Sequence, residues 1–287
     1  MTPEDLVSGV IRLVSLPEIC LRVNEMLEDS STTAQELGAV ISRDAGLTAR
    51  LLKIVNSTFY GFPSRVETVS RAVTIIGLRE LRGLVLAASA VETFSKIPSE
   101  VLNRVQFWRH SVYTGVVAQL IAQECHVLHS ERLFVAGLLH DIGKLIISHR
   151  LPDATKKIKA AVINERCFDF EAERNELGFD HADVGGLLLQ EWKMPPSLFD
   201  AVKFHHTPQL AKENSIDAAI VHIANSITGM AEEGLDVDLE QMVQPVEDVA
   251  WKVVGLDESV IDTLFNKAGP LFADALEVVL PKSSPMY

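Results

Sequence analysis

The stretch from Glu131 to His149, ERLFVAGLLHDIGKLIISH, constrains the fold of this chain more than any other part of the sequence. Its apolar residues recur at three- and four-residue spacings, which predicts one helix with a wide apolar face. His140 and Asp141 lie within this apolar run, and Lys144 follows one turn later. Burying such a pair is costly unless a partner satisfies it, and a divalent metal ion is one such partner. For an isolated pair, the alternative is a core histidine that is satisfied without metal.

Helical spacings continue along the chain, while strand signals are nearly absent: we find no two-residue alternation and no Asn-Gly or Asp-Gly hairpin turn. The sequence therefore predicts an all-α, two-lobed protein. Its first lobe is an N-terminal helical bundle over residues 1–98, and its second is a helical lobe over residues 99–287 that carries the candidate site. Pro98 and Ser99 mark the boundary.

Two further segments of the second lobe are expected to lie at its periphery. The polar stretch from residue 164 to residue 180 is the longest candidate for a mobile or surface segment. Helices are expected near residues 239–254 and 259–279, and their apolar faces either cap this lobe or help the chain to form a homodimer.

Composition excludes several classes of protein. The formal net charge of −13 argues against a general nucleic-acid binder, because neutralising phosphates needs a basic surface. Cys20, Cys125 and Cys167 lie far apart without a CxxC pair, which disfavours a disulfide framework and a zinc ribbon. The N-terminus carries acids where a signal peptide needs basic residues, and no run of about 18 apolar residues predicts a membrane span. We therefore expect a cytoplasmic protein.

Five of the nine histidines form an ordered set with Asp141 on different predicted helices. The members of the set are His110, His140, Asp141, His181, His205 and His206. A helical bundle can bring such side chains to one centre, and imidazole with carboxylate suits zinc, iron, manganese or nickel. Six ligands are too many for one tetrahedral ion and suit two octahedral ions completed by water. Two ions about 3.5–4 Å apart can clamp a phosphate displacement.

Individual members of the set have simpler interpretations when they are taken alone. The pair His205-His206 is typical of a solvated helix end, and His110 of a core or capping histidine. Lys144 alone is typical of a surface lysine that extends its charge into solvent. Only the combination favours a metal site.

The order His, His-Asp, His, His-His resembles the HD superfamily of metal-dependent phosphohydrolases, and LLHDIGKL is especially similar to its HD-GYP cyclic-di-GMP phosphodiesterase branch. Further motifs resemble a sibling family, the HD-related output domain or HDOD. These motifs are Ser42–Thr48, Asn56–Gly61, Ala72-Val73, Ile76–Leu78, Gly185, Trp192–Pro195 and His205–Pro208. The resemblance covers roughly residues 12–230. It implies an all-α fold found in bacterial signalling and regulatory proteins, usually without demonstrated catalysis.

The resemblance assigns roles to residues of this chain. The six members of the histidine-aspartate set match metal ligands of the HD-GYP pattern, and Lys144 matches a lysine that meets a substrate phosphate. Two departures count against activity: Thr207-Pro208-Gln209 replaces the expected glycine-tyrosine-proline, and Asn225 replaces a last aspartate ligand. A neutral amide oxygen is a weaker donor than a carboxylate, so one of the two ions is expected to bind weakly or not at all.

The sequence thus predicts a regulatory module that holds a metal and binds a signalling partner protein or a nucleotide. The alternative is an active metal-dependent phosphodiesterase that acts on a cyclic dinucleotide. In that case Asp141 and Lys144 are the catalytic residues: Asp141 would bridge the two ions and Lys144 would neutralise a phosphate oxygen.

Overall fold

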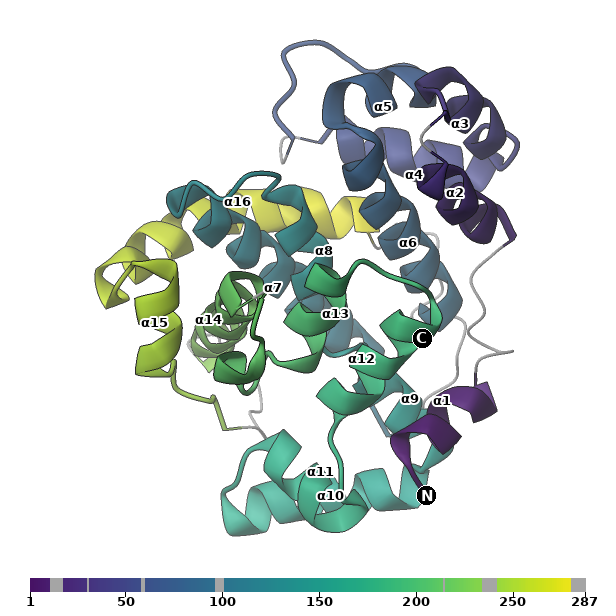
Figure 1. Ribbon diagram of the computed structural model, residues 1–287. Helices are drawn as coiled ribbons and strands as arrows, with labels where there is room; N and C mark the ends of the chain where they lie inside the picture. The colour runs from purple at the N-terminus through teal and green to yellow at the C-terminus, as the bar shows by residue number, and fades with distance from the viewer. Residues whose placement is uncertain are drawn as a thin grey trace. The chain divides into compact units, whose positions relative to one another are not determined.

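The described structure is entirely helical in its regular elements, as Figure 1 shows. This computed structural model describes residues 1–10, 18–29, 31–57, 60–95, 101–213, 215–233 and 242–279. The all-α prediction is confirmed. Among the described helices, none combines the length and the apolar character that a membrane crossing requires.

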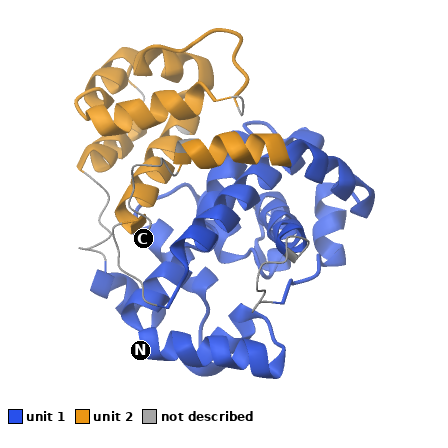
Figure 2. Ribbon diagram, turned by 180° about the vertical axis from the view of Figure 1, so that it is seen from behind, with its two compact units in different colours: residues 1–13, 97–268 blue, residues 14–96, 269–287 orange. Residues whose placement is uncertain are grey.

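The chain divides into two compact units, coloured separately in Figure 2. We call residues 1–13 and 97–268 the histidine unit, and residues 14–96 and 269–287 the smaller unit. Helix α1 (Pro3–Val10) belongs to the histidine unit because it contacts α9 and α12 of that unit. The last division between the units falls within α16 (Ile261–Val279). The predicted boundary at Pro98 and Ser99 lies outside the described residues, so the division into lobes at residue 98 stays a prediction.

The smaller unit is a bundle without any residue of the predicted site. Its helices are α2 (Glu18–Glu28), α3 (Ala34–Ile41), α4 (Ala45–Val55), α5 (Val69–Ile76), α6 (Leu78–Ser95) and the end of α16. Asn56 follows α4 and joins it to the next loop: its side chain donates to Val66 O and accepts from Val66 N. The motif that begins at Asn56 therefore has a structural role at that residue; its residues 58 and 59 lie outside the described part of the chain.

The histidine unit is built around α7, α8 and α14, which pack against one another. Its helices are α1, α7 (Arg104–Glu124), α8 (Glu131–Leu139), α9 (Ile142–Arg150), α10 (Pro152–Glu165), α11 (Asp169–Leu177), α12 (His181–Glu191), α13 (Pro196–Lys203), α14 (Ser215–Glu233), α15 (Asp248–Val254), the start of α16, and the short 3-10 helices Pro208–Leu210 and Glu258–Val260. Much of α7 is buried on every side, including Val112, Val116 and Ile121. This burial makes α7 the central helix of the unit.

Two glycines let α7 and α8 approach so closely that their backbones touch. A Cβ atom placed on Gly137 would lie 2.7 Å from the Cα of Gly115, and one on Gly115 would lie 2.7 Å from the carbonyl oxygen of Phe134. Any larger residue would separate the helices. The close approach holds His140, at the end of α8, beside His110 of α7, with their ring centres 5.4 Å apart.

The single helix predicted over residues 131–149 is wrong, because the chain breaks at His140 and Asp141. Helix α8 ends at Leu139, α9 begins at Ile142, and Asp141 has φ −96° and ψ 7°. In an unbroken helix, neighbouring side chains point about 100° apart. The break brings His140 Nε2 within 3.4 Å of Asp141 Oδ1, so both side chains serve one centre.

Candidate metal centre

The carboxylate of Asp141 lies among four imidazole rings. Its Oδ1 atom is 3.0 Å from His181 Nε2 and 3.8 Å from His205 Nε2, besides the contact with His140. Its Oδ2 atom lies 4.0 Å from His110 Nε2. Asp141 is almost fully buried. The structure therefore gathers these predicted ligands, which come from α7, the α8–α9 break, α12 and the turn after α13, around one carboxylate.

The remaining predicted ligands lie next to this cluster. His206 Nε2 is 2.9 Å from His181 Nε2, and Asn225 Oδ1 of α14 is 3.0 Å from His110 Nε2. The ligand atoms form two groups of three, and within each group they lie within 4.8 Å of one another. The groups are His110, His140 and Asp141, and His181, His205 and His206. This grouping suits one or two cations.

Two of the rings are oriented by backbone carbonyls. His140 Nδ1 donates to Gly137 O at 2.7 Å, and His205 Nδ1 donates to Val202 O at 2.7 Å. A carbonyl only accepts, so the proton of each neutral ring sits on Nδ1 and Nε2 carries a lone pair. Both Nε2 atoms are buried, and neither has a hydrogen-bond partner among the described residues. A buried acceptor of this kind is satisfied by a bound cation.

Two further rings are oriented by carboxylates. His181 Nδ1 donates to Glu173 Oε2 at 2.6 Å, and the same oxygen accepts from the backbone N–H of His181 at 2.7 Å. His110 Nδ1 lies 3.0 Å from Glu232 Oε2. Metal-ligating histidines commonly give their second ring N–H to a carboxylate or a carbonyl, which fixes the ring and strengthens it as a ligand.

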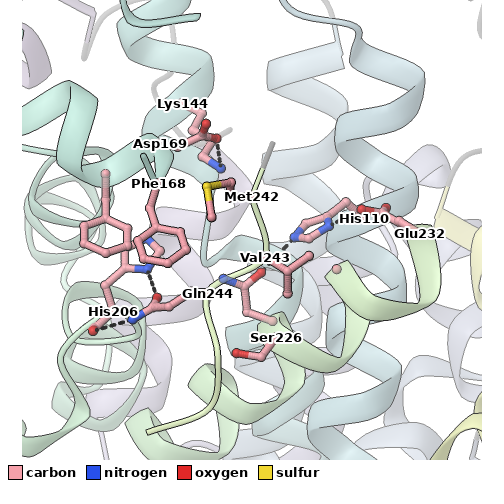
Figure 3. Close-up of a pocket in the computed structure, with 13 residues that line it drawn as sticks. His110, Lys144, Phe168, Asp169, His206, Ser226, Glu232, Met242, Val243 and Gln244 are labelled. Atoms are coloured by element: carbon pink, nitrogen blue, oxygen red, sulfur yellow. Dashed lines mark hydrogen bonds and ion pairs between the residues drawn. The ribbon is translucent and has the colours of Figure 1, made fainter. Parts of the chain in front are cut away.

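The fifth ring, His206, is oriented by an amide from a distant part of the chain. His206 Nδ1 donates to Gln244 Oε1 at 2.8 Å, as Figure 3 shows. All five rings thus use Nδ1 for an outward hydrogen bond, and their Nε2 atoms lie around Asp141 or His181. Donor chemistry and orientation both fit a divalent cation.

Sequence reasoning missed three of these orienting groups, Glu173, Glu232 and Gln244. Glu173 lies in the stretch 164–180 that is predicted to be mobile or at the surface. Residues 169–177 form α11, and the prediction is wrong for Glu173, which is only 5% exposed. In the sequence, a glutamate within a polar stretch looks like a solvent-exposed residue. Glu173 is buried in the structure because it pairs with His181.

The pKa of His181 is shifted in the opposite direction to the pKa values of three neighbouring histidines. Burial lowers the pKa of His140 to about 4, and burial together with neighbouring imidazoles holds the pKa of His205 and of His206 well below the usual range. These three rings are neutral at pH 7, as metal ligands must be. Burial also acts to lower the pKa of His181, but the carboxylate of Glu173 overcomes it and raises that pKa to about 10. A cation bound at His181 Nε2 has to displace a proton.

Lys144 is held between two carboxylates. Its Nζ atom lies 3.0 Å from Asp141 Oδ2 and 3.1 Å from Asp169 Oδ2, and its side chain is 17% exposed. Burial opposes its charge, but these two partners outweigh burial and raise the pKa of Lys144 above its usual range. Lys144 is therefore a partly buried ammonium group that is paired with two carboxylates.

A small cavity of about 60 Å³ opens beside the centre, shown in Figure 3. Its lining includes His110, Lys144, Asp169, His206 and Asn225. Pockets that bind drug-sized ligands usually measure about 300–1,000 Å³. At about 60 Å³ the cavity is far smaller than such a pocket.

Glu173→Gln is expected to lower metal affinity by about 10- to 100-fold, the usual effect of losing an outer-shell partner. Glutamine keeps the size of the side chain but removes the charge that holds His181. Glu176→Gln is the matched control, because Glu176 lies on the same helix and pairs with Lys157 near the surface. Competition titration with a chelating dye would measure the affinities. Equal affinities for Glu173→Gln and wild type would show that Glu173 does not support a ligand.

Comparison with known proteins supports one family. The model of the HDOD domain matches residues 13–208. An HDOD domain protein of unknown function from Geobacter sulfurreducens superposes with a TM-score of 0.74 at 26% identity, over 97% of each chain. A candidate phosphohydrolase from Shewanella amazonensis SB2B superposes with a TM-score of 0.73 at 25% identity, over 96% of this chain and 97% of the other. An uncharacterised Treponema pallidum protein is 28% identical over 211 residues, or 69% of this chain, which spans only 38% of that relative.

Proposed function

The chain belongs to the HDOD family, and from this premise we propose that it is a metal-holding regulatory module of bacterial signal transduction. The proposed ligands are His110, His140, Asp141, His181, His205 and His206, with Asn225 as a weak neutral donor. One observation carries the proposal: five buried or half-buried rings donate outward through Nδ1, and four of them direct Nε2 at the buried carboxylate of Asp141 while the fifth, His206, directs it at His181. The module acts by binding a signalling protein or a nucleotide.

Binding is favoured over catalysis by two features of the same site. The charge of Lys144 is already paired with Asp141 and Asp169, so it is not available to a substrate phosphate. Asn225 contributes no negative charge where a second cation needs one. Both features reduce the capacity of the site to stabilise a phosphoryl transition state.

The second candidate is a metal-dependent phosphohydrolase, and the complete histidine-aspartate set favours it. A pair of divalent ions supplies a polarised phosphoryl oxygen and a water of lowered pKa. Incubation with cyclic-di-GMP and other phosphodiesters in Mn(II), Fe(II) or Ni(II) separates the candidates. Turnover that disappears in His140→Ala supports the enzyme; bound metal without turnover supports the module.

Elemental analysis tests the metal centre directly. Protein purified without chelators, or reconstituted with Mn(II), Fe(II), Ni(II) or Zn(II), is expected to retain stoichiometric metal after gel filtration. A matched His149→Ala variant, which changes a histidine outside the set, should retain the same amount. Absence of stoichiometric metal with every one of these ions would refute the proposal.

Asn225→Asp is expected to tighten metal binding by about tenfold, or ~1.4 kcal/mol. The substitution places a carboxylate oxygen where an amide oxygen now lies 3.0 Å from His110 Nε2, and adds a negative charge to the site. Asn164→Asp makes the same change at an exposed position of α10 and serves as the control. Mass spectrometry of bound metal and calorimetric titration would measure the change. Identical occupancy in Asn225→Asp and wild type would count against a ligand role for this position.

A further inference from the structure

Residues 242–247, which we call the strap, cross the cavity beside the candidate metal centre. Met242, Val243 and Gln244 form one wall of that cavity, as Figure 3 shows. The strap has no regular secondary structure. Its position is therefore set by its contacts with the rest of the unit.

The first contact is between Gln244 and His206. The side chain of Gln244 accepts from His206 Nδ1 at 2.8 Å and donates from its amide nitrogen to His206 O at 3.3 Å. One amide thus pairs with both the ring and the backbone of a proposed ligand. This pairing is specific, because it uses a donor and an acceptor at once.

The second contact is a notch in α14. A Cβ atom placed on Gly229 would lie 2.8 and 2.9 Å from the two methyl groups of Val243. Glycine at this position therefore makes the space that Val243 fills. A third contact follows at the end of the strap, where Glu247 N–H donates to His222 Nε2 at 3.1 Å. Three contacts at different residues hold the strap in place.

The strap occupies the approach to polar groups that suit a phosphate. Asn225 and Ser226 line the cavity together with the proposed ligands His110 and His206, but only about 60 Å³ is left beneath the strap. Lifting the strap would remove a wall of the cavity and widen it toward the size of a ligand pocket.

We propose that the strap is an internal plug that closes the metal centre to phosphate-bearing ligands, and that the centre becomes accessible when Val243 leaves the notch at Gly229. This inference rests on the proposed metal centre. It makes the described conformation a closed state, which a ligand or partner shifts by binding the open state more tightly.

The test uses two variants that disturb the notch without touching a proposed ligand. Gly229→Val fills the notch from α14, and Val243→Gly removes the group that occupies it. Gly46→Val is the control, because an added Cβ atom at this other helical glycine meets only side-chain atoms, at 3.4 Å or more. Inorganic phosphate is titrated into the manganese-loaded full chain by calorimetry, and bound manganese is measured in the same samples. Hydrogen exchange at the Glu247 amide reports strap release.

Both notch variants are expected to bind phosphate at least tenfold more tightly than wild type and the control, with faster exchange at Glu247 and unchanged manganese content. Unchanged phosphate affinity despite faster exchange would overturn the plug. Unchanged exchange in both variants would also overturn it, because the notch would then not hold the strap. Loss of manganese from every form, including wild type, would instead refute the metal centre.

Discussion

Gly143→Ala is expected to destabilise the histidine unit by about 3 kcal/mol or more, at the upper end of the usual cost of overpacking. A Cβ atom at this position of α9 would lie 2.1 Å from His181 O and 2.9 Å from Gly185 N. Both are backbone atoms of α12, so no change of rotamer relieves the clash. The two helices have to separate, and Asp141 then moves away from His181.

Gly46→Ala, at an exposed position of α4, provides a control that is not expected to destabilise the fold. An added Cβ atom there meets only side-chain atoms, at 3.4 Å or more, and alanine stabilises a helical position by about 0.5–1 kcal/mol relative to glycine. Urea unfolding followed by circular dichroism would compare the two variants. A midpoint for Gly143→Ala at or above that of wild type would show that α9 and α12 are not held together at this glycine.

The overall fold and the members of the site could be predicted because both depend on local features. Helical periodicity is a property of short windows of sequence, and it extends through the whole chain. The order of the histidines and Asp141 could be read directly from the sequence. The break at His140 and Asp141 could not, because the apolar period of residues 131–149 continues across it. Gly137 and Gly143, on either side of the break, pack closely against residues that are distant in the sequence, Gly115 and His181. This packing cannot be read from residues 131–149 alone.

The groups that orient the ligands could not be predicted for a similar reason. Gln244 lies 38 positions from His206 in the sequence, and Glu232 lies 122 positions from His110. Their hydrogen bonds exist only after the helices have packed. Glu173 is nearer, eight positions from His181, but a glutamate in a polar stretch gives no sign of burial. The ligands are thus visible as residue types, whereas their support is a property of tertiary structure.

Asp141→Ala is expected to weaken metal binding by more than about 100-fold, beyond the upper end of the effect of outer-shell partners. Asp141 is the carboxylate among the proposed ligands, and its Oδ1 atom lies within 3.8 Å of three imidazole nitrogens. Its removal leaves a set of neutral donors near the partly buried charge of Lys144. Lys144 then keeps only one of the two carboxylates with which it pairs, Asp169 at 3.1 Å. Its positive charge therefore repels an incoming cation more strongly than in the wild type.

The control for this substitution is Asp153→Ala, since the side chain of Asp153 is 91% exposed. Metal content and calorimetric affinity would be measured for both variants, with circular dichroism to show that each is folded. The variant Asp141→Asn distinguishes the effect of side-chain volume from the effect of charge. It keeps the volume of the side chain but removes its charge, and it is also expected to lose most of the affinity for metal. If Asp141→Ala bound metal as tightly as wild type, the histidines alone would hold the ion. The inward orientation of five Nε2 atoms would then need an explanation that does not involve this carboxylate.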